Sequence, residues 1–248
     1  KNQLQADVPV ATFMSSGVDS SLITALSSQF HKGITAFTLG FIADKYGDEV
    51  KIASEIAKDL PINHVVDLVD PVDVLDGIKD MVLCYEEPKG FIDPQFLISK
   101  TVSNQSHKVI LSGIGADEIF SGYNYHRWLK LWNISRKLKN ILALFRNKST
   151  FLKKLSEVST YDNLTDYYII NWASMTESRK KELFSLGNYL NLDTHQKIKE
   201  KTPYSQQLVS DLNYLSYLDL NHYLPDNFLY RSDQFMMNFS LEGRFPYL

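Results

Sequence analysis

The sequence predicts an α/β fold, a doubly wound parallel sheet followed by a mainly helical region. Residues 8 to 124 alternate short apolar runs with amphipathic stretches, the pattern of a parallel sheet covered by helices. Two turns rich in serine and glycine each follow a strand-like run and open a helix-like one. A chain of 248 residues, 44% hydrophobic and 22% charged, can bury a sizeable core. We expect two domains, a sheet core at 1–126 and a helical region at 127–248.

The apolar runs predict four strands, at 8–14, 34–41, 64–68 and 108–112. Between and after them the amphipathic stretches predict helices at 20–30, 47–59, 71–85 and 94–106. In a doubly wound sheet the first and fourth strands are neighbours at the point where the strand order reverses, and ligands bind outside the carboxyl ends of the strands there. We therefore expect the loops that follow these two strands to face each other.

The first of these loops lies within residues 8–21, which read VPVATFMSSGVDSS. A strand, a tight turn and a helix in this order direct unpaired N–H groups and the positive end of the helix dipole at one point, which suits a phosphate. The turn contains no lysine, so it is not a Walker-type loop. Asp19 is placed to hold Mg²⁺, and four serines supply hydroxyl groups: Ser15, Ser16, Ser20 and Ser21. The alternative is a serine-capped turn without a ligand.

The second loop lies within residues 108–123, which read KVILSGIGADEIFSGY. Gly113 and Gly115 permit a close approach of backbone, and Asp117 is placed to complete a metal site with Asp19. Taken alone, acidic residues at a helix start stabilise the helix dipole with no ligand present. The pairing of the two loops favours the metal site.

SSGVDSS followed by LSGIGADEIFSGY resembles the synthetase domain of the glutamine-dependent asparagine synthetases, whose relatives include β-lactam synthetases and peptide-cyclising enzymes. The first motif is similar to the PP-loop of the ATP pyrophosphatases, SGGxDS, with Ser16 in place of the first glycine. The resemblance continues at 46–57, at Glu87-Pro88 and at 215–248, where Glu242, Arg244 and Pro246 match the family's SLEVRVPFLD. It implies a sheet of the ATP pyrophosphatase (adenine nucleotide alpha hydrolase-like) type.

The resemblance also implies a chemistry: ATP-dependent formation of an amide bond by an AMP-forming ligase. A carboxylate attacks the α-phosphorus of ATP, pyrophosphate leaves, and ammonia or an amine then attacks the acyl-adenylate. The implied cofactors are ATP and Mg²⁺, with Asp19 and Asp117 as metal ligands. The catalytic residues it implies are Asp19, Asp117, Glu118 and Glu242. The nucleotide-binding residues it implies are Phe13, Ser15, Ser16, Gly17, Asp19, Ser20, Leu39, Ser112, Gly113 and Gly115.

The sequence departs from the family at Ile114, where asparagine synthetases carry a glutamate and β-lactam synthetases a tyrosine. Isoleucine cannot transfer a proton. Another group such as Glu118, Tyr123 or Glu242 then serves, or the amine arrives neutral, or the second half-reaction is changed or lost. Two alternatives therefore stay open: a nucleotide-binding domain that has lost amide synthesis, and a cyclase or amidotransferase that acts on a different carboxylate.

The family's glutaminase domain is not in this sequence, and the sequence stops inside a family motif at Leu248, before the lysine that the family uses downstream. We therefore expect a fragment of a longer protein, with ammonia or an amine supplied from outside this chain. The expected substrate is a small-molecule or peptide carboxylate. The sequence leaves the oligomeric state open.

The net charge of −3 argues against nucleic acid as a partner. The absence of an 18-residue apolar run and of a leader pattern favours the cytoplasm. Residues 127–154 carry nine Lys or Arg and no acid, with apolar residues at roughly helical spacing. Such a helix either lies on a membrane or an acidic partner, or packs its apolar stripe into the core, and we favour the core. We also expect Cys84 to be a buried core residue.

Overall fold

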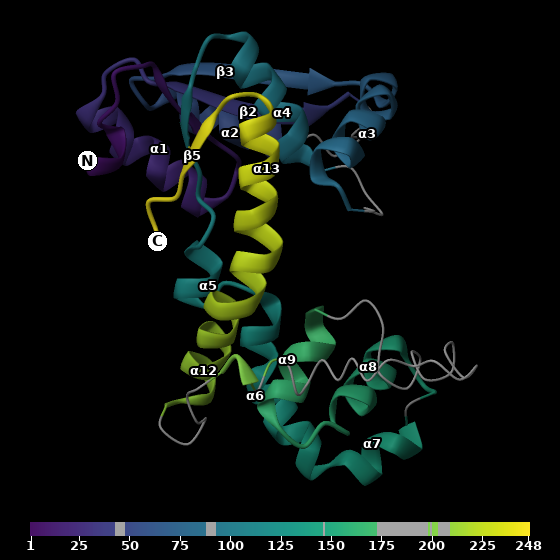
Figure 1. Ribbon diagram of the computed structural model, residues 1–248. Coiled ribbons are helices and arrows are strands. Elements are labelled where there is room, and N and C mark those ends of the chain that lie inside the picture. Colours follow the sequence, from purple (N-terminus) through teal and green to yellow (C-terminus); the bar gives the residue numbers. More distant parts are fainter. Residues whose placement is uncertain (43–47, 88–92, 146, 173–197, 199, 203–208) are drawn as a thin grey trace. The chain divides into compact units, whose positions relative to one another are not determined.

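A computed structural model describes the chain except for residues 43–47, 88–92, 146, 173–197, 199 and 203–208 (Figure 1). The chain forms two compact units, one of residues 1–116 and 225–248 and one of residues 117–224. The sequence predicted one division, after residue 126. The two units divide after residue 116 and again after residue 224, and the second division arises because the last 24 residues (225–248) belong with the sheet.

The first unit contains a parallel sheet in the order β3-β2-β1-β4-β5. Its strands are β1 (Val10–Phe13), β2 (Thr35–Phe41), β3 (Asn63–Val69), β4 (Val109–Leu111) and β5 (Glu242–Arg244). The four expected strands are confirmed within two residues at each end. Val10 pairs with Val109 and Thr12 with Leu111, so the expected adjacency of the first and fourth strands is confirmed. The carboxyl ends of β1 and β4 therefore lie next to each other.

Helices pack on both faces of this sheet, as a doubly wound fold requires. They are α1 (Val18–Phe30), α2 (Asp48–Lys58), α3 (Pro71–Tyr85), α4 (Pro94–Asn104) and α13 (Tyr230–Asn238). Side chains of β1 alternate between the faces: Val10 packs with Ile23 of α1, and Ala11 packs with Ile98 of α4 and Met236 of α13. The four helices expected from the sequence are all present.

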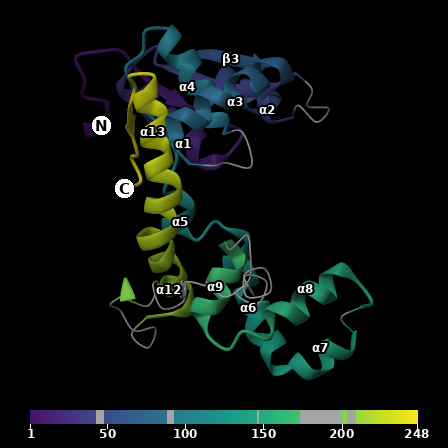
Figure 2. The ribbon, with the colours of Figure 1, turned by 45° about the vertical axis from the view of Figure 1, so that its right-hand side comes forward.

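Strand β5 is the one element of the described sheet that the sequence did not predict. Its three residues, EGR, show no alternation of apolar and polar side chains. They form a strand because β4 offers a free edge, and Gly243 pairs with Ile110. Helix α13 lies beside β5 (Figures 1 and 2) and contributes the fully buried Phe235 and Met236 to the core. These contacts bring the C-terminal segment into the first unit.

The second unit is helical in the part that the structure describes. Its helices are α5 (Ala116–Phe120, which begins at the boundary), α6 (Asn124–Lys137), α7 (Lys139–Phe145), α8 (Thr150–Val158), α9 (Leu164–Trp172) and α12 (Asp211–Leu218). The 11-residue π-helix η3 (Asp219–Leu229) follows α12. Trp132, Leu164, Tyr167 and Leu215 form the centre of its core.

The burial of apolar side chains changes along the basic stretch 127–154. On α6, Leu129 and Trp132 are buried, as expected for a core-facing stripe. Trp128, Leu138 and Phe145 are exposed within the unit, so the stripe does not continue onto α7. None of the described helices is both long enough and apolar enough to span a bilayer.

Candidate functional site

The turn between β1 and α1 is closed by serine hydroxyl groups. The Ser15 N–H donates to Ser20 Oγ at 3.0 Å, the two hydroxyl oxygens lie 2.8 Å apart, and the Gly17 N–H donates to Ser15 Oγ at 3.1 Å. The Ser21 hydroxyl donates to the Ser15 carbonyl at 3.0 Å. Side chains that bond one another in this way fix the turn at the carboxyl end of β1.

The residue that caps helix α1 is Gly17, which has an extended backbone and no side chain to cap with. No serine side chain caps the helix itself; the serine hydroxyls close the turn that precedes and enters it. The N–H groups of residues 18–20 have no acceptor within the helix, because a first turn never does. They and the helix dipole favour an anion at this point.

The loop after β4 lies in contact with this first turn. A Cβ on Gly113 would come within 3.0 Å of Ser20 N and 3.3 Å of the Asp19 carbonyl carbon. Gly115 has a positive φ of 98°, and a Cβ there would lie 2.7 Å from Leu248 Cδ2. Glycine is thus required at 113 by close approach and at 115 by backbone conformation. The structure brings the two predicted loops together at the carboxyl ends of adjacent parallel strands.

Four further predicted nucleotide residues lie at the same end of the sheet. Phe13 ends β1, and Leu39 lies on β2, two residues beyond the partner of Phe13 in the register. Both are partly buried against the core that includes Phe37 and Ile110. Ser112 follows β4, is buried, and accepts a hydrogen bond from the Ile114 N–H at 3.4 Å. Ser16 lies half-buried in the first turn.

The predicted metal ligands belong to different units. Asp19 lies in the first turn of α1, where the Tyr247 hydroxyl donates to its backbone carbonyl at 3.1 Å. Asp117 is the first residue of the second unit and lies on α5. Its carboxylate lies against Gly122, since a Cβ on Gly122 would fall 1.9 Å from Asp117 Oδ1. Within the described residues no three His, Cys, Asp or Glu side chains converge as a metal site. The pairing of Asp19 with Asp117 stays a prediction.

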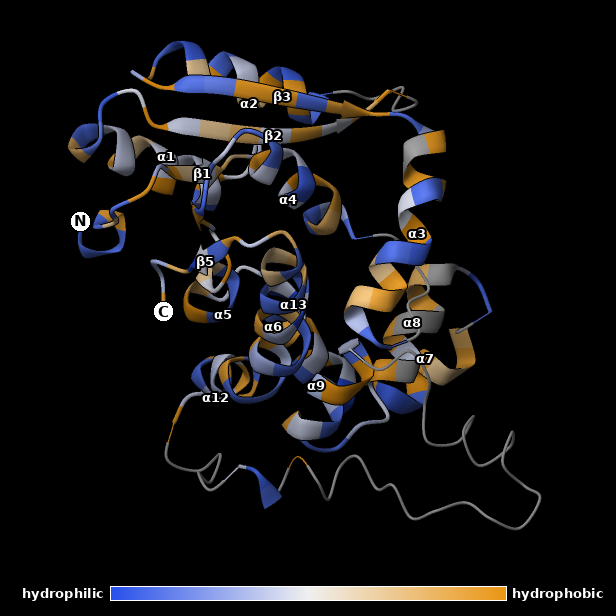
Figure 3. Cartoon of the chain, turned by 45° about the horizontal axis from the view of Figure 1, so that its top comes forward, coloured by the Kyte–Doolittle hydropathy of each residue, from blue (hydrophilic) through white to orange (hydrophobic). Residues whose placement is uncertain are grey.

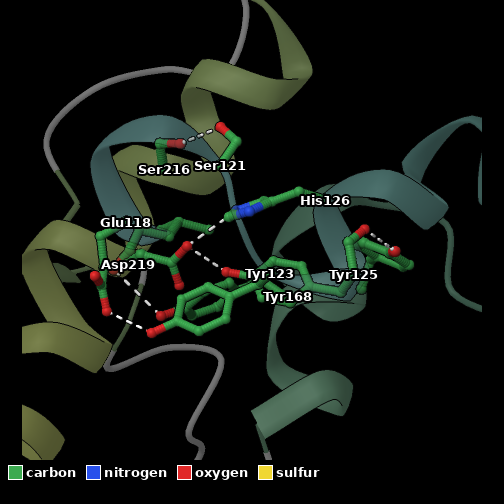
Figure 4. Close-up of polar contacts among 10 residues, drawn as sticks. Glu118, Ser121, Tyr123, Tyr125, His126, Tyr168, Ser216 and Asp219 are labelled. Carbon is green, nitrogen blue, oxygen red and sulfur yellow. Dashed lines mark hydrogen bonds and ion pairs between the residues drawn. The ribbon is translucent and has the colours of Figure 1, made fainter. Parts of the chain in front are cut away.

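Glu118 is buried in the second unit, with 1% of its surface exposed. The Tyr123 hydroxyl donates to its Oε1 at 2.5 Å (Figure 4). Burial raises the pKa of the Glu118 carboxyl, and the bond from Tyr123 opposes that rise only in part. Burial and the neighbouring carboxylate also raise the pKa of Tyr123 far above its ordinary value, so the phenol stays protonated. The folded protein therefore holds a proton on Glu118 more readily than an exposed glutamate would.

A second buried polar group in this unit was not predicted from the sequence. Asp219 is fully buried, its Oδ2 accepts a short hydrogen bond from the Tyr125 hydroxyl, and His126 Nε2 lies 3.0 Å from the same oxygen (Figure 4). Burial and the Asp219 carboxylate raise the pKa of Tyr125. Tyr125 and Asp219 are 94 residues apart in the sequence, so no local pattern could have joined them.

Glu242 lies at the amino end of β5, where it pairs with Val109. Its side chain is 60% exposed, and its Oε1 lies 2.6 Å from Arg244 Nε. Arg244 in turn donates to the backbone carbonyls of Gln3 and Gln5, both at 2.8 Å. Glu242 thus lies at the amino end of its strand, whereas the two loops described above follow carboxyl ends, and its catalytic role stays a prediction.

The chain is similar in sequence to asparagine synthetases. The model of the asparagine synthase family matches residues 1–248. Asparagine synthetase [glutamine-hydrolyzing] 1 of Bacillus subtilis (strain 168) is 30% identical over 261 residues, which cover 99% of this chain and 39% of that protein. A putative asparagine synthetase [glutamine-hydrolyzing] of Mycobacterium tuberculosis (strain ATCC 25618 / H37Rv) is 31% identical over 50% of this chain and 19% of its own length. The chain spans well under half the length of these relatives.

Proposed function

The chain belongs to the asparagine synthase family, and from this premise we propose that it activates a carboxylate with ATP and forms an amide from the acyl-adenylate. The observation that carries the proposal is the contact between Gly113 and the first turn of α1. It puts two glycine-containing loops at the reversal point of a parallel sheet, where such folds bind nucleotides.

In this proposal the phosphates of ATP lie on the turn from Ser15 to Ser20. The N–H groups at the start of α1 and the serine hydroxyls are donors, and the absence of a side chain at Gly113 lets the second loop close on the same point. The adenine lies toward Phe13 and Leu39, which present partly buried apolar surface from neighbouring strands. A group held on both sides by backbone is positioned for in-line attack at its α-phosphorus.

The residues present fit a magnesium ion, which is usually held in such sites by one or two carboxylates together with phosphate oxygens. Asp19 offers a carboxylate at the first turn of α1, and Gly122 leaves the space that the Asp117 carboxylate occupies. We assign these two aspartates as its ligands. When bound, Mg²⁺ neutralises charge on the departing pyrophosphate.

The chemical steps then require little covalent chemistry from the chain. A carboxylate oxygen of the substrate bonds to the α-phosphorus as the bond to pyrophosphate breaks. An amine nitrogen next bonds to the acyl carbon, loses a proton, and AMP departs. Ile114 cannot accept that proton, whereas the buried Glu118 has a raised pKa suited to proton transfer. The exposed and ion-paired Glu242 is less suited.

Both relatives are named as glutamine-hydrolyzing enzymes. We propose that glutamine likewise supplies the nitrogen here, through a glutaminase part of the full-length protein, and that the reaction takes place in the cytoplasm. The second candidate function is nucleotide binding without amide synthesis, which the loss of a titratable side chain at Ile114 favours.

Exchange of labelled pyrophosphate into ATP tests the adenylation step in the full-length protein. We expect exchange to depend on one class of carboxylate, and Asp19→Asn or Asp117→Asn to lower it ~100-fold or more, the usual loss for one electrostatic stabiliser. Asp59→Asn, an exposed residue after α2, is the matched control and should leave exchange unchanged. Binding of ATP with no exchange for any carboxylate would instead support the second candidate.

A further inference from the structure

The first unit contains a cavity of about 650 Å³ that takes no part in the function proposed above. Its walls come from strand β3, from α3 and α4, and from the end of α13. Strand β3 ends the described sheet and carries hydrophilic and apolar residues along its length (Figure 3). Neither the turn after β1 nor the loop after β4 contributes to the wall. The volume is within the range of sites for small molecules.

Apolar side chains form one part of the lining, which we call the floor. It includes the buried Phe96 and Leu97 of α4, with Cys84 and Phe239. The expectation that Cys84 is a buried core residue holds only in part, because its side chain is half-buried in this wall and its thiol donates to the Gln234 carbonyl. Such a floor binds a hydrocarbon group by removing it from water.

Gly77 of α3 keeps the floor accessible. A Cβ on Gly77 would meet Leu97 Cδ2 at 3.5 Å and Phe96 Cε1 at 4.0 Å, which are ordinary van der Waals distances. A larger side chain at 77 would therefore extend over these two residues and occupy the cavity. The helix can accept it, since Gly77 does not require a positive φ.

The charged part of the lining is mostly acidic. Asp76 and Asp80 lie one turn apart on α3, Asp67 comes from β3, and Lys100 of α4 is the one basic residue among those that line the cavity. The Asp67 carboxylate accepts a short hydrogen bond from the Thr101 hydroxyl, which fixes it in the wall. Three carboxylates against one ammonium give the lining a net charge of −2, so an anion is repelled and a cation attracted.

We propose that this cavity binds a small organic cation, an ammonium group on a hydrocarbon body. The apolar floor takes the body and the carboxylates take the charge. A bare metal ion does not fit, because among the described residues these aspartates do not converge on one point. A neutral hydrocarbon would leave the carboxylates without a counter-charge. The site is independent of ATP and of the loops after β1 and β4.

Phenethylammonium is a suitable probe, with phenethyl alcohol and 3-phenylpropionate as the neutral and anionic partners of the same size. Binding is measured by saturation-transfer NMR titration of the protein. We expect the ammonium to bind about tenfold more tightly than the alcohol, from its attraction to the carboxylates, and the carboxylate more weakly than either. Equal affinity for ammonium and alcohol, or no saturable binding of the ammonium, would overturn the proposal.

Variants locate the binding. The double variant Asp76→Asn, Asp80→Asn should remove most of the preference for the ammonium. The control Glu55→Gln, Asp59→Asn removes the same charge from α2 and the residue after it, outside the cavity, and should preserve the preference. Gly77→Leu should abolish binding by filling the space, with the fold checked by circular dichroism. Unchanged affinity in Gly77→Leu would show that the probe binds elsewhere and would refute the assignment.

Discussion

Gly113→Ala tests the contact on which the proposed nucleotide site depends. The added Cβ would lie 3.0 Å from Ser20 N and 3.3 Å from both Asp19 C and Ser20 Cα. All three are backbone atoms of the first turn of α1, so no flexible side chain can move aside, and the loop and the helix must separate. Gly113 does not have a positive φ, so backbone strain adds nothing. Overpacking of this kind costs about 1–3 kcal/mol.

The matched control is Gly77→Ala, whose Cβ would meet its nearest atom at 3.5 Å. Because Gly77 lies inside helix α3, alanine should stabilise the protein by about 0.5–1 kcal/mol. Urea unfolding measures both changes. We also expect the affinity of Gly113→Ala for ATP to fall about tenfold or more in titration calorimetry, since the donors of the two loops no longer converge. If Gly113→Ala unfolds at the same midpoint as Gly77→Ala, or binds ATP as the wild type does, the reasoning is wrong.

Two further changes test the packing of each unit. Arg231→Met leaves the buried Asp93 carboxylate, now 2.8 Å from Arg231 Nε, without its counter-charge and should cost about 3–5 kcal/mol of unfolding free energy. Lys139→Met removes the exposed ion pair with Asp162, whose atoms lie 3.9 Å apart, and should change the unfolding free energy by less than about 1 kcal/mol. Similar losses of unfolding free energy in the two variants would contradict this account. Glu118 has a raised pKa when folded, so the folded protein holds this proton more tightly, and stability should fall as the pH rises from the ordinary glutamate pKa to the raised one. Glu118→Gln should remove that part of the pH dependence. If the unfolding free energy of Glu118→Gln changes with pH in the same way as that of the wild type over this range, the prediction is wrong.

The sequence predicted strands β1 to β4 and helices α1 to α4 because each carries its own signal. Val10–Phe13 and Val109–Leu111 are apolar runs that end at serine and glycine, and Pro71 and Pro94 open the helices that they were expected to open. Strand β5 has no such signal, because its three residues form a strand only on the free edge of β4. The same lack of a signal is why residues 225–248 were expected in the helical region and not with the sheet.

The candidate site shows the same contrast. Ser15, Gly17, Ser20 and Gly113 could be identified from two short motifs, since each motif fixes its own turn. The buried group of Tyr125, His126 and Asp219 could not, because its members come from helices far apart in the sequence. Glu242 was identified from a family motif, but its ion pair with Arg244 became visible only in the structure.

The sequence by itself determined the alternation of strands and helices and the two loops, because backbone propensity and local hydrogen bonds act over a few residues. Only the tertiary structure decided that Gly113 lies on the first turn of α1, that the C-terminal segment adds a strand to the sheet, and that three aspartates line part of a cavity beside β3. These features depend on contacts between segments that are distant in the chain. Their free energy comes from packing and burial, which a local pattern does not encode.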